Sequence, residues 1–158
     1  FMIQSEIISI YKGVKTRTIS HLKDLKYLKP LEKKMSSYEL ITHISLIEKN
    51  LFIERLKSGL HTYKHSEITG YTEKEEIIHL YESVFVETLE FFKSKDDIFF
   101  KQSVTTLNGN QVSAFKWIHL LLEHEIHHRS QILFYLSLDG TDIEPIFGIK
   151  SEQIMNFE

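Results

Sequence analysis

The chain has 158 residues, of which 42% are apolar and 26% charged, a composition typical of one globular domain with a substantial buried core. Its 19 basic and 22 acidic residues are interspersed and give a net charge of -3, which excludes a disordered chain and disfavours nucleic-acid binding. It contains no cysteine and no apolar run of the roughly 18 residues that a membrane span needs, which excludes thiolate ligands and membrane insertion. We therefore expect a single cytoplasmic domain over residues 2–158.

The N-terminal half of the sequence predicts two helices. The first covers about residues 3–28 and ends before Pro30, which cannot continue a helix. The second covers about residues 36–57. Ser36 and Glu39 at its start have the spacing of a capping box, in which each side chain bonds to the backbone of the other residue.

The C-terminal half predicts two more helices. After a polar connection, Thr72 and Glu75 repeat the capping-box spacing and begin a helix over residues 72–93. A long crossover, residues 94–110, contains an Asn-Gly turn signal and forms either a short hairpin or an irregular loop. The last helix covers residues 111–138, and the tail after it is expected to pack across it. The predicted fold is all-α, an antiparallel four-helix bundle with a long crossover loop.

Two histidines of the last predicted helix lie on its inward-facing side. His124 and His128 are one helical turn apart, which places their Cβ atoms about 5–6 Å apart, so one metal ion can accept a nitrogen from each. His43, on the apolar stripe of the second helix, is the best-placed third ligand. The inward seam of the last helix repeats at intervals of three and four residues: Ala114, Trp117, Leu121, His124, His128, Gln131, Tyr135 and Leu138.

Other histidines are placed less favourably for metal binding. His79 falls on a polar stripe of the third helix, and His61 and His65 lie in the polar connection, so we expect all three to be solvated. His127 is one step off the inward seam and is expected to flank the site.

Burial of several imidazoles together favours a bound metal ion. A single buried histidine is more often a packed core residue than a ligand. Two adjacent inward imidazoles change this balance, because burying them without partners costs desolvation energy. Three neutral histidines without a carboxylate would leave a divalent ion with its full charge and an open coordination position. This pattern is typical of a catalytic ion.

Two other metal motifs match parts of the sequence. Residues His124 to His128 fit H-E-x-x-H, the zinc-protease motif, but such enzymes take a third ligand downstream and no histidine follows His128. Two E-x-x-H pairs, Glu76 with His79 and Glu125 with His128, are part of a di-iron bundle site. Glu76 and His79 lie opposite the apolar stripe of their helix, which argues against a di-iron centre.

The C-terminal part of the sequence resembles a known family. The segment HEIHHRSQILFYLSLDG, residues 124–140, followed by EPIFG, is similar to the last helix and tail of the DinB-like metalloenzymes, which carry an H-x-x-x-H-R-G-Q motif. TRTISHL and SSYELITHISLIEKN resemble the first two helices of that family, with His43 at the position of its first metal-binding histidine. Ser130 replaces the common glycine of the motif and is small enough for the same packing.

The resemblance implies a four-helix bundle, often a homodimer, with a long crossover between helices two and three or three and four. It also implies a divalent metal ion held by His43, His124 and His128, with zinc or nickel favoured over iron or manganese. Characterised relatives use a low-molecular-weight thiol such as bacillithiol, mycothiol or glutathione. We therefore expect the partners to be a small-molecule thiol and an electrophilic substrate, with no nucleic acid and no membrane.

The leading hypothesis is a metal-dependent thiol S-transferase. In this hypothesis Gln131 orients a ligand or the substrate, and Arg129 holds a carboxylate of the thiol or pairs with Glu125. One alternative is a small metal-dependent hydrolase with Glu125 as general base. The other is a non-catalytic, stress-related bundle with a structural ion or none.

Overall fold

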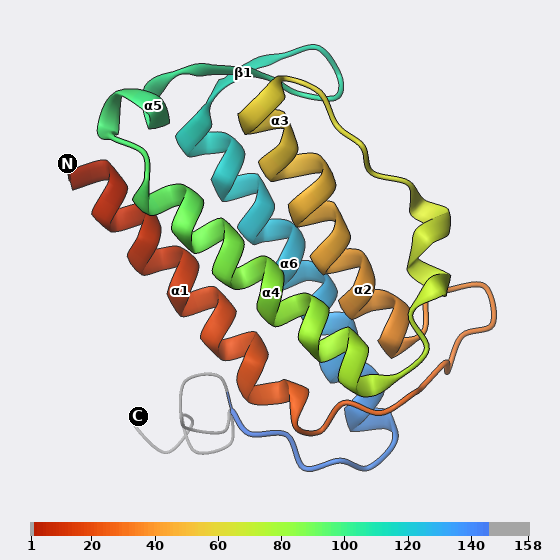
Figure 1. The fold of residues 1–158 in the computed structure, drawn as a ribbon. Helices are drawn as coiled ribbons and strands as arrows, with labels where there is room; N and C mark the ends of the chain where they lie inside the picture. Colours follow the sequence, from red (N-terminus) through yellow and green to blue (C-terminus); the bar gives the residue numbers. More distant parts are fainter. Residues whose placement is uncertain (1, 146–158) are drawn as a thin grey trace, which may run out of the picture.

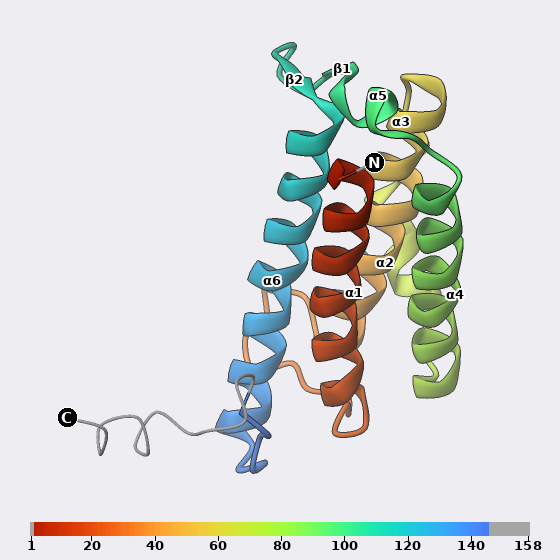
Figure 2. The same ribbon diagram turned by 90° about the vertical axis from the view of Figure 1, so that its left-hand side faces the viewer.

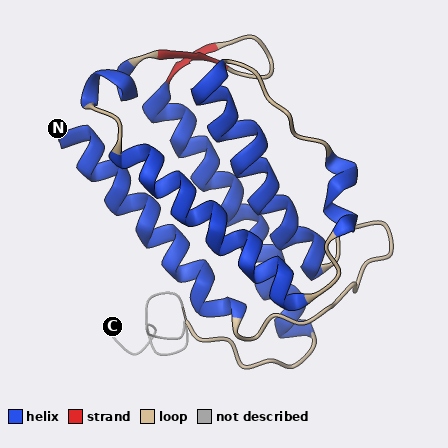
Figure 3. Cartoon of the chain, viewed as in Figure 1, coloured by secondary structure: helices blue, strands red, loops and turns tan. Residues whose placement is uncertain are grey.

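Four long helical segments form a bundle in the computed structural model, which describes residues 2–145 (Figure 1). This confirms the all-α four-helix prediction. The four segments are α1 (Met2–Leu22), α2 (Ser37–Ile47), α4 (Lys74–Lys93) and α6 (Ala114–Leu138); α2 continues through a π-helical stretch, η1 (Glu48–Ile53), into α3 (Glu54–Ser58). The shorter elements are a 3-10 helix, η2 (His65–Gly70), the helix α5 (Asp97–Lys101) and the strands β1 (Ser103–Thr105) and β2 (Gln111–Ser113) (Figure 3).

The directions and contacts of the four long helices define how the chain runs through the bundle. Helices α1 and α6 run in one direction and α2 and α4 in the other (Figures 1 and 2). Each of α1 and α2 packs against both α4 and α6, so α1 and α2 lie on one diagonal. The segment that crosses the full length of the bundle is therefore residues 59–73, between α3 and α4. Residues 94–110, which we expected to be a long crossover, instead close one end of the bundle.

Hydrogen bonds explain where α2 begins and where α1 ends. The predicted capping box at Ser36 is confirmed: the Glu39 N–H donates to Ser36 Oγ at 3.1 Å, and the Ser36 N–H donates to Glu39 Oε2 at 2.7 Å. Helix α1 ends at Leu22, not at residue 28 as predicted. The reason is Ser37, whose hydroxyl accepts from the Leu28 N–H and donates to the Lys26 carbonyl, holding that segment in a non-helical loop.

Two other predicted boundaries also moved. The Thr72 and Glu75 capping box is not formed, because α4 begins at Lys74 after an extended Glu73 that makes no side-chain cap bond. Helix α6 begins at Ala114, not at residue 111, because residues 111–113 pair antiparallel with β1. Of the two forms expected for residues 94–110, the structure shows the hairpin.

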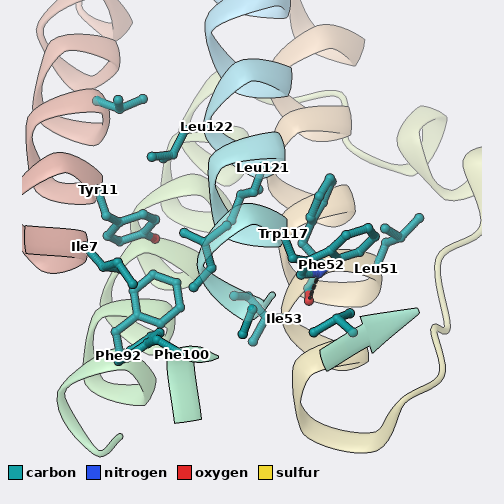
Figure 4. Close-up of a cluster of buried hydrophobic side chains, with 14 residues drawn as sticks. Ile7, Tyr11, Leu51, Phe52, Ile53, Phe92, Phe100, Trp117, Leu121 and Leu122 are labelled. Atoms are coloured by element: carbon teal, nitrogen blue, oxygen red, sulfur yellow. Dashed lines mark hydrogen bonds between the residues drawn. The ribbon is translucent and has the colours of Figure 1, made fainter. Parts of the chain in front are cut away.

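The apolar core has two clusters separated by a polar layer. The first, shown in Figure 4, lies toward the β hairpin and is rich in aromatic residues. The second lies toward the opposite end and includes Leu40, Ile77 and Leu136. Between them, each long helix contributes buried polar side chains, which are Lys15, Thr18, Glu48, Thr88, Glu125 and Arg129. None of the described helices combines the length and apolar character that a membrane span requires.

Candidate metal centre

His43 of α2 meets His124 and His128 of α6 beside the polar layer. The ring centroids are 4.9 Å apart for His43 and His124, 4.7 Å for His43 and His128, and 4.5 Å for His124 and His128. One nitrogen from each ring lies within 4.8 Å of the other two. The structure therefore brings together the three residues that the sequence predicted as ligands.

The orientation of the rings fits a single metal ion. The Nε2 atoms of His43 and His124 face each other at 3.0 Å. Two nitrogens bound tetrahedrally to one zinc ion at its usual bond length would be about 3.3 Å apart. Hydrogen bonds occupy Nδ1 of His43 and of His128, so Nε2 of each ring is left for an ion.

Burial keeps the three imidazoles neutral. It lowers the pKa of His43 to about 3 and that of His124 to about 4, with a smaller effect from neighbouring histidines. The pKa of His128 is also lowered, again mainly by burial. At neutral pH each ring therefore offers a nitrogen lone pair to a cation without first having to lose a proton.

Two further side chains hydrogen-bond to the candidate ligand rings, and a third bonds to one of those two. Gln131 Oε1 accepts from Nδ1 of His128 at 2.7 Å, a contact of the kind expected for this residue. Tyr63 lies with its hydroxyl 2.6 Å from Nδ1 of His43 and 2.9 Å from Nδ1 of His65. If the His43 Nδ1–H donates to Tyr63, the Tyr63 hydroxyl donates to His65, and Nε2 of His43 is free to bind metal.

Tyr63 and His65 were missed from the sequence. His65 is exposed, as expected, but its ring centroid is only 5.5 Å from that of His43. Both residues lie in or next to an irregular connection, where no periodicity indicates which way a side chain points. The other predictions for histidines are confirmed: His79 is exposed, and His127 is exposed with its ring 4.8 Å from that of His128.

Glu125 and Arg129 point away from the histidines, into the polar layer. Glu125 Oε2 accepts from Thr18 at 2.8 Å and from Tyr81 at 2.7 Å, while Oε1 accepts from Lys15. Arg129 Nη1 donates to the Val14 carbonyl at 3.1 Å and to Thr18 at 3.2 Å. These contacts tie α6 to α1 and α4, and they occupy the groups that we expected to serve as general base and as thiol anchor.

Lys15 joins two carboxylates at the centre of the polar layer. Its ammonium group bonds to both Glu48 and Glu125, and all three side chains are almost completely buried. Burial would lower the pKa of Lys15, but the charges of Glu125 and Glu48 outweigh it, and the net shift is upward. Burial raises the pKa of Glu48 and that of Tyr11, which donates to Glu48. This cluster could not be predicted from the sequence, because lysine and glutamate in helices usually face solvent.

Two hollows lie on either side of the histidines. A groove of about 600 Å³, here called the Trp117 groove, lies between η1, the hairpin and α6 and reaches His124. Its lining consists of Ile47, Leu51, Phe52, Thr106, Leu107, Asn108, Asn110, Val112, Lys116, Trp117, Leu120 and His124. A smaller hollow of about 360 Å³ lies on the other side, where Gln131 and Lys34 contribute to its wall. The site therefore has space for small molecules beside it.

Comparison with known families gives one match. The model described as the DinB superfamily matches residues 14–132, a segment that includes the three histidines and the whole polar layer. No curated protein sequence matches the chain.

Solved structures with a similar fold include three bacterial proteins. YfiT from Bacillus subtilis, described as a probable metal-dependent hydrolase with an unusual four-helix bundle topology, has a TM-score of 0.72 at 13% identity, covering 88% of this chain and 89% of its own. The DinB-like protein YjoA from Bacillus subtilis has a TM-score of 0.62 at 24% identity, covering 92% and 96%. A putative DinB family member from Exiguobacterium sibiricum has a TM-score of 0.64 at 21% identity, covering 92% and 97%.

A fourth structure is a mycothiol-dependent maleylpyruvate isomerase, with a TM-score of 0.64 at 15% identity. The match covers 82% of this chain but only 60% of the isomerase, which is the longer protein. All four similarities support the same four-helix fold.

Proposed function

The chain belongs to the DinB superfamily, and on that premise we propose that it is a divalent-metal-dependent enzyme with His43, His124 and His128 as ligands. Zinc or nickel is the proposed ion, since both accept imidazole nitrogen readily. The donor set supports this proposal, because three neutral rings present nitrogens to one point. A homodimer is also proposed, and sedimentation analysis of the purified protein tests it.

The proposed reaction is transfer of a low-molecular-weight thiol of the bacillithiol type to an electrophile. A bound divalent ion would supply Lewis acidity that favours the thiolate near neutral pH. The thiol loses its proton to solvent, its sulfur forms a bond to the electrophilic carbon, and the leaving group departs with the electrons of the broken bond. Gln131 and Tyr63 fix the histidine rings, and the Trp117 groove gives a small molecule access to His124.

One observation carries this proposal: among the described residues, the group that could hold an ion consists of three histidines without a carboxylate, and it adjoins an apolar groove. A site without a carboxylate suits a thiol, because a thiol releases its proton far more readily than water does. The mycothiol-dependent enzyme of the same fold supports this choice.

A metal-dependent hydrolase is the second candidate, supported by the description of YfiT. Hydrolysis is helped by a base that takes a proton from the attacking water. Glu125 would have to leave Lys15, Thr18 and Tyr81 to serve as that base. We therefore rank hydrolysis below thiol transfer.

Metal analysis of untagged protein tests the proposed site. We expect close to one divalent ion per chain, and loss of that ion when His43, His124 and His128 are all replaced by alanine. His79→Ala is the matched control, because His79 is exposed on α4. Unchanged metal content in the triple variant would contradict the proposed ligands, and an absence of metal in the wild-type protein would support the non-catalytic alternative.

Turnover assays separate thiol transfer from hydrolysis. Loss of a model electrophile is measured with the metal-loaded protein alone and with added bacillithiol, glutathione or cysteine. Thiol transfer requires acceleration by at least one thiol and a thioether product. Equal rates with and without thiol would support hydrolysis.

A further inference from the structure

We propose that the Trp117 groove binds the electrophile, and that this substrate has an apolar body and an anionic group about 12 Å from its reacting carbon. The inference rests on the proposed function, because it places the reacting end of the substrate beside His124. Two observations carry it: the groove is continuous with the histidine cluster, and a single cation lies at its far end.

The walls of the groove come from three elements. Phe52 and Leu51 of η1 lie on one side, with Trp117 of α6 beside them (Figure 4). Trp117 is fixed by a hydrogen bond from its Nε1 to the Phe52 carbonyl at 3.0 Å, and its ring centroid is 4.5 Å from that of Phe52. The hairpin supplies the third wall, including Leu107, which is 60% exposed. A volume of about 600 Å³ is in the range of small-molecule sites.

Lys116, Leu120 and His124 form one stripe along α6. They are spaced four residues apart, so all three face the groove, and all three line it. Eight residues separate Lys116 from His124, which corresponds to a rise of about 12 Å along the helix. A linear apolar body with an anionic end group can therefore lie along Leu120, with its anionic end at Lys116 and its other end at His124.

The charges that line the groove favour an anion at the hairpin end. Lys116 is exposed, and it is the only charged residue among those lining the groove. Asn108 and Asn110 of the hairpin add polar groups to the lining. A neutral chain with a terminal carboxylate, sulfonate or phosphate matches this pattern, whereas a cationic end group would be repelled by Lys116.

The only tryptophan of the chain lies in this groove, so its fluorescence reports binding directly. The probes are octane-1-sulfonate, which is a poor metal ligand, and neutral octan-1-ol, titrated against metal-loaded and metal-free protein. We expect saturable changes in emission with both probes and both forms. Lys116→Gln should weaken sulfonate binding roughly three- to fivefold, the effect of one exposed charge pair, and leave octanol binding unchanged.

Two further variants sharpen the test. Lys12→Gln removes an exposed lysine of α1, outside the groove, and should change neither affinity. Leu107→Asp puts a negative charge at the hairpin wall, on an exposed position where folding is not at risk, and should weaken sulfonate more than octanol. The proposal is overturned if neither probe saturates, if Lys116→Gln matches Lys12→Gln, or if the emission changes with protein concentration alone, which would indicate a second copy covering the groove.

The outcomes separate this inference from the proposed function. If octane-1-sulfonate binds as expected but no thiol accelerates turnover, the groove is an anion-selective site and the proposed thiol transfer is wrong. If a thiol does accelerate turnover but the Lys116 variant binds both probes normally, the substrate class proposed here fails alone.

Discussion

His124 and Glu125 are consecutive residues of α6 that serve two different clusters. The His124 ring faces Nε2 of His43, whereas the Glu125 carboxylate accepts from Lys15, Thr18 and Tyr81. A step of one residue turns a side chain by about 100° around a helix, which accounts for the separation. The charged residue next to His124 therefore contributes to the packing of the bundle and does not face the candidate metal centre.

Replacement of Lys15 by methionine should strongly destabilise the protein. The change leaves Glu48 and Glu125 buried without their cation, which typically costs about 3–5 kcal/mol of unfolding free energy. Urea denaturation measures this loss. Lys12→Met, at an exposed position of the same helix, should change the unfolding free energy by less than about 0.5 kcal/mol. Equal stability of the two variants would show that the buried charges are not coupled.

Tyr63→Phe should weaken metal binding without unfolding the protein. The hydroxyl is the hydrogen-bond partner of Nδ1 of His43, and loss of such a partner typically reduces metal affinity about 10- to 100-fold. Competition with a chromophoric chelator measures the affinity. Tyr27→Phe is the control, because Tyr27 is exposed and packs against Tyr38 away from the histidines. If the Tyr63 variant binds metal as tightly as the control variant, Tyr63 has no role in metal binding.

Two substitutions of Gln131 test whether its hydrogen bond to His128 supports metal binding. Gln131→Ala removes the acceptor for Nδ1 of His128 and should weaken metal binding about tenfold or more. Gln131→Glu keeps an acceptor of the same length and should retain most of the affinity. The same chelator competition applies to both variants, and an alanine variant that binds as tightly as the glutamate variant would argue against a hydrogen bond to His128.

The metal-free protein should lose stability between pH 7 and pH 5. The folded-state pKa values of His43 and His124, about 3 and about 4, lie below the usual 6.5, so in this range the unfolded chain binds more protons than the folded one. Stability therefore falls with falling pH, by on the order of 1 kcal/mol for each of the two rings at pH 5 after allowance for solvent screening. The midpoints of urea denaturation, measured between pH 7 and pH 5, test this predicted loss of stability. The triple alanine variant should show a flatter profile, and identical profiles would contradict the assignment.

The sequence predicted the helices and the three histidines because both leave periodic patterns. His124 and His128 repeat at the helical period, and His43 falls on an apolar stripe, so their inward orientation follows from spacing alone. The family model and the bundle confirm the predicted fold. Helix ends were predicted less well: α1 stops at Leu22 because Ser37, distant in sequence, captures the following segment.

The parts of the site that were not predicted lack such patterns. Tyr63 reaches His43 from an irregular connection, and its position depends on how residues 59–73 cross the bundle. Lys15 and Glu48 are charged residues in helices, for which solvent exposure is the usual outcome. Only the diagonal placement of α1 and α2, both packed against α6, brings Lys15 between Glu48 and Glu125. Part of the tail expected to pack across α6, residues 146–158, lies outside the described residues.

The polar layer has a consequence for the alignment of the helices. The hydrophobic effect is non-directional, so burial of apolar surface alone fixes the alignment of two helices less strictly than a buried ion pair does. Lys15 forms such a pair: a shift of α1 by one turn, about 5.4 Å, would leave two buried carboxylates without a cation. The same layer joins α1 to η1 and α6, the segments adjoining His43 and carrying His124. The buried charges thus fix the axial alignment of the helices, and with it the relative positions of His43, His124 and His128.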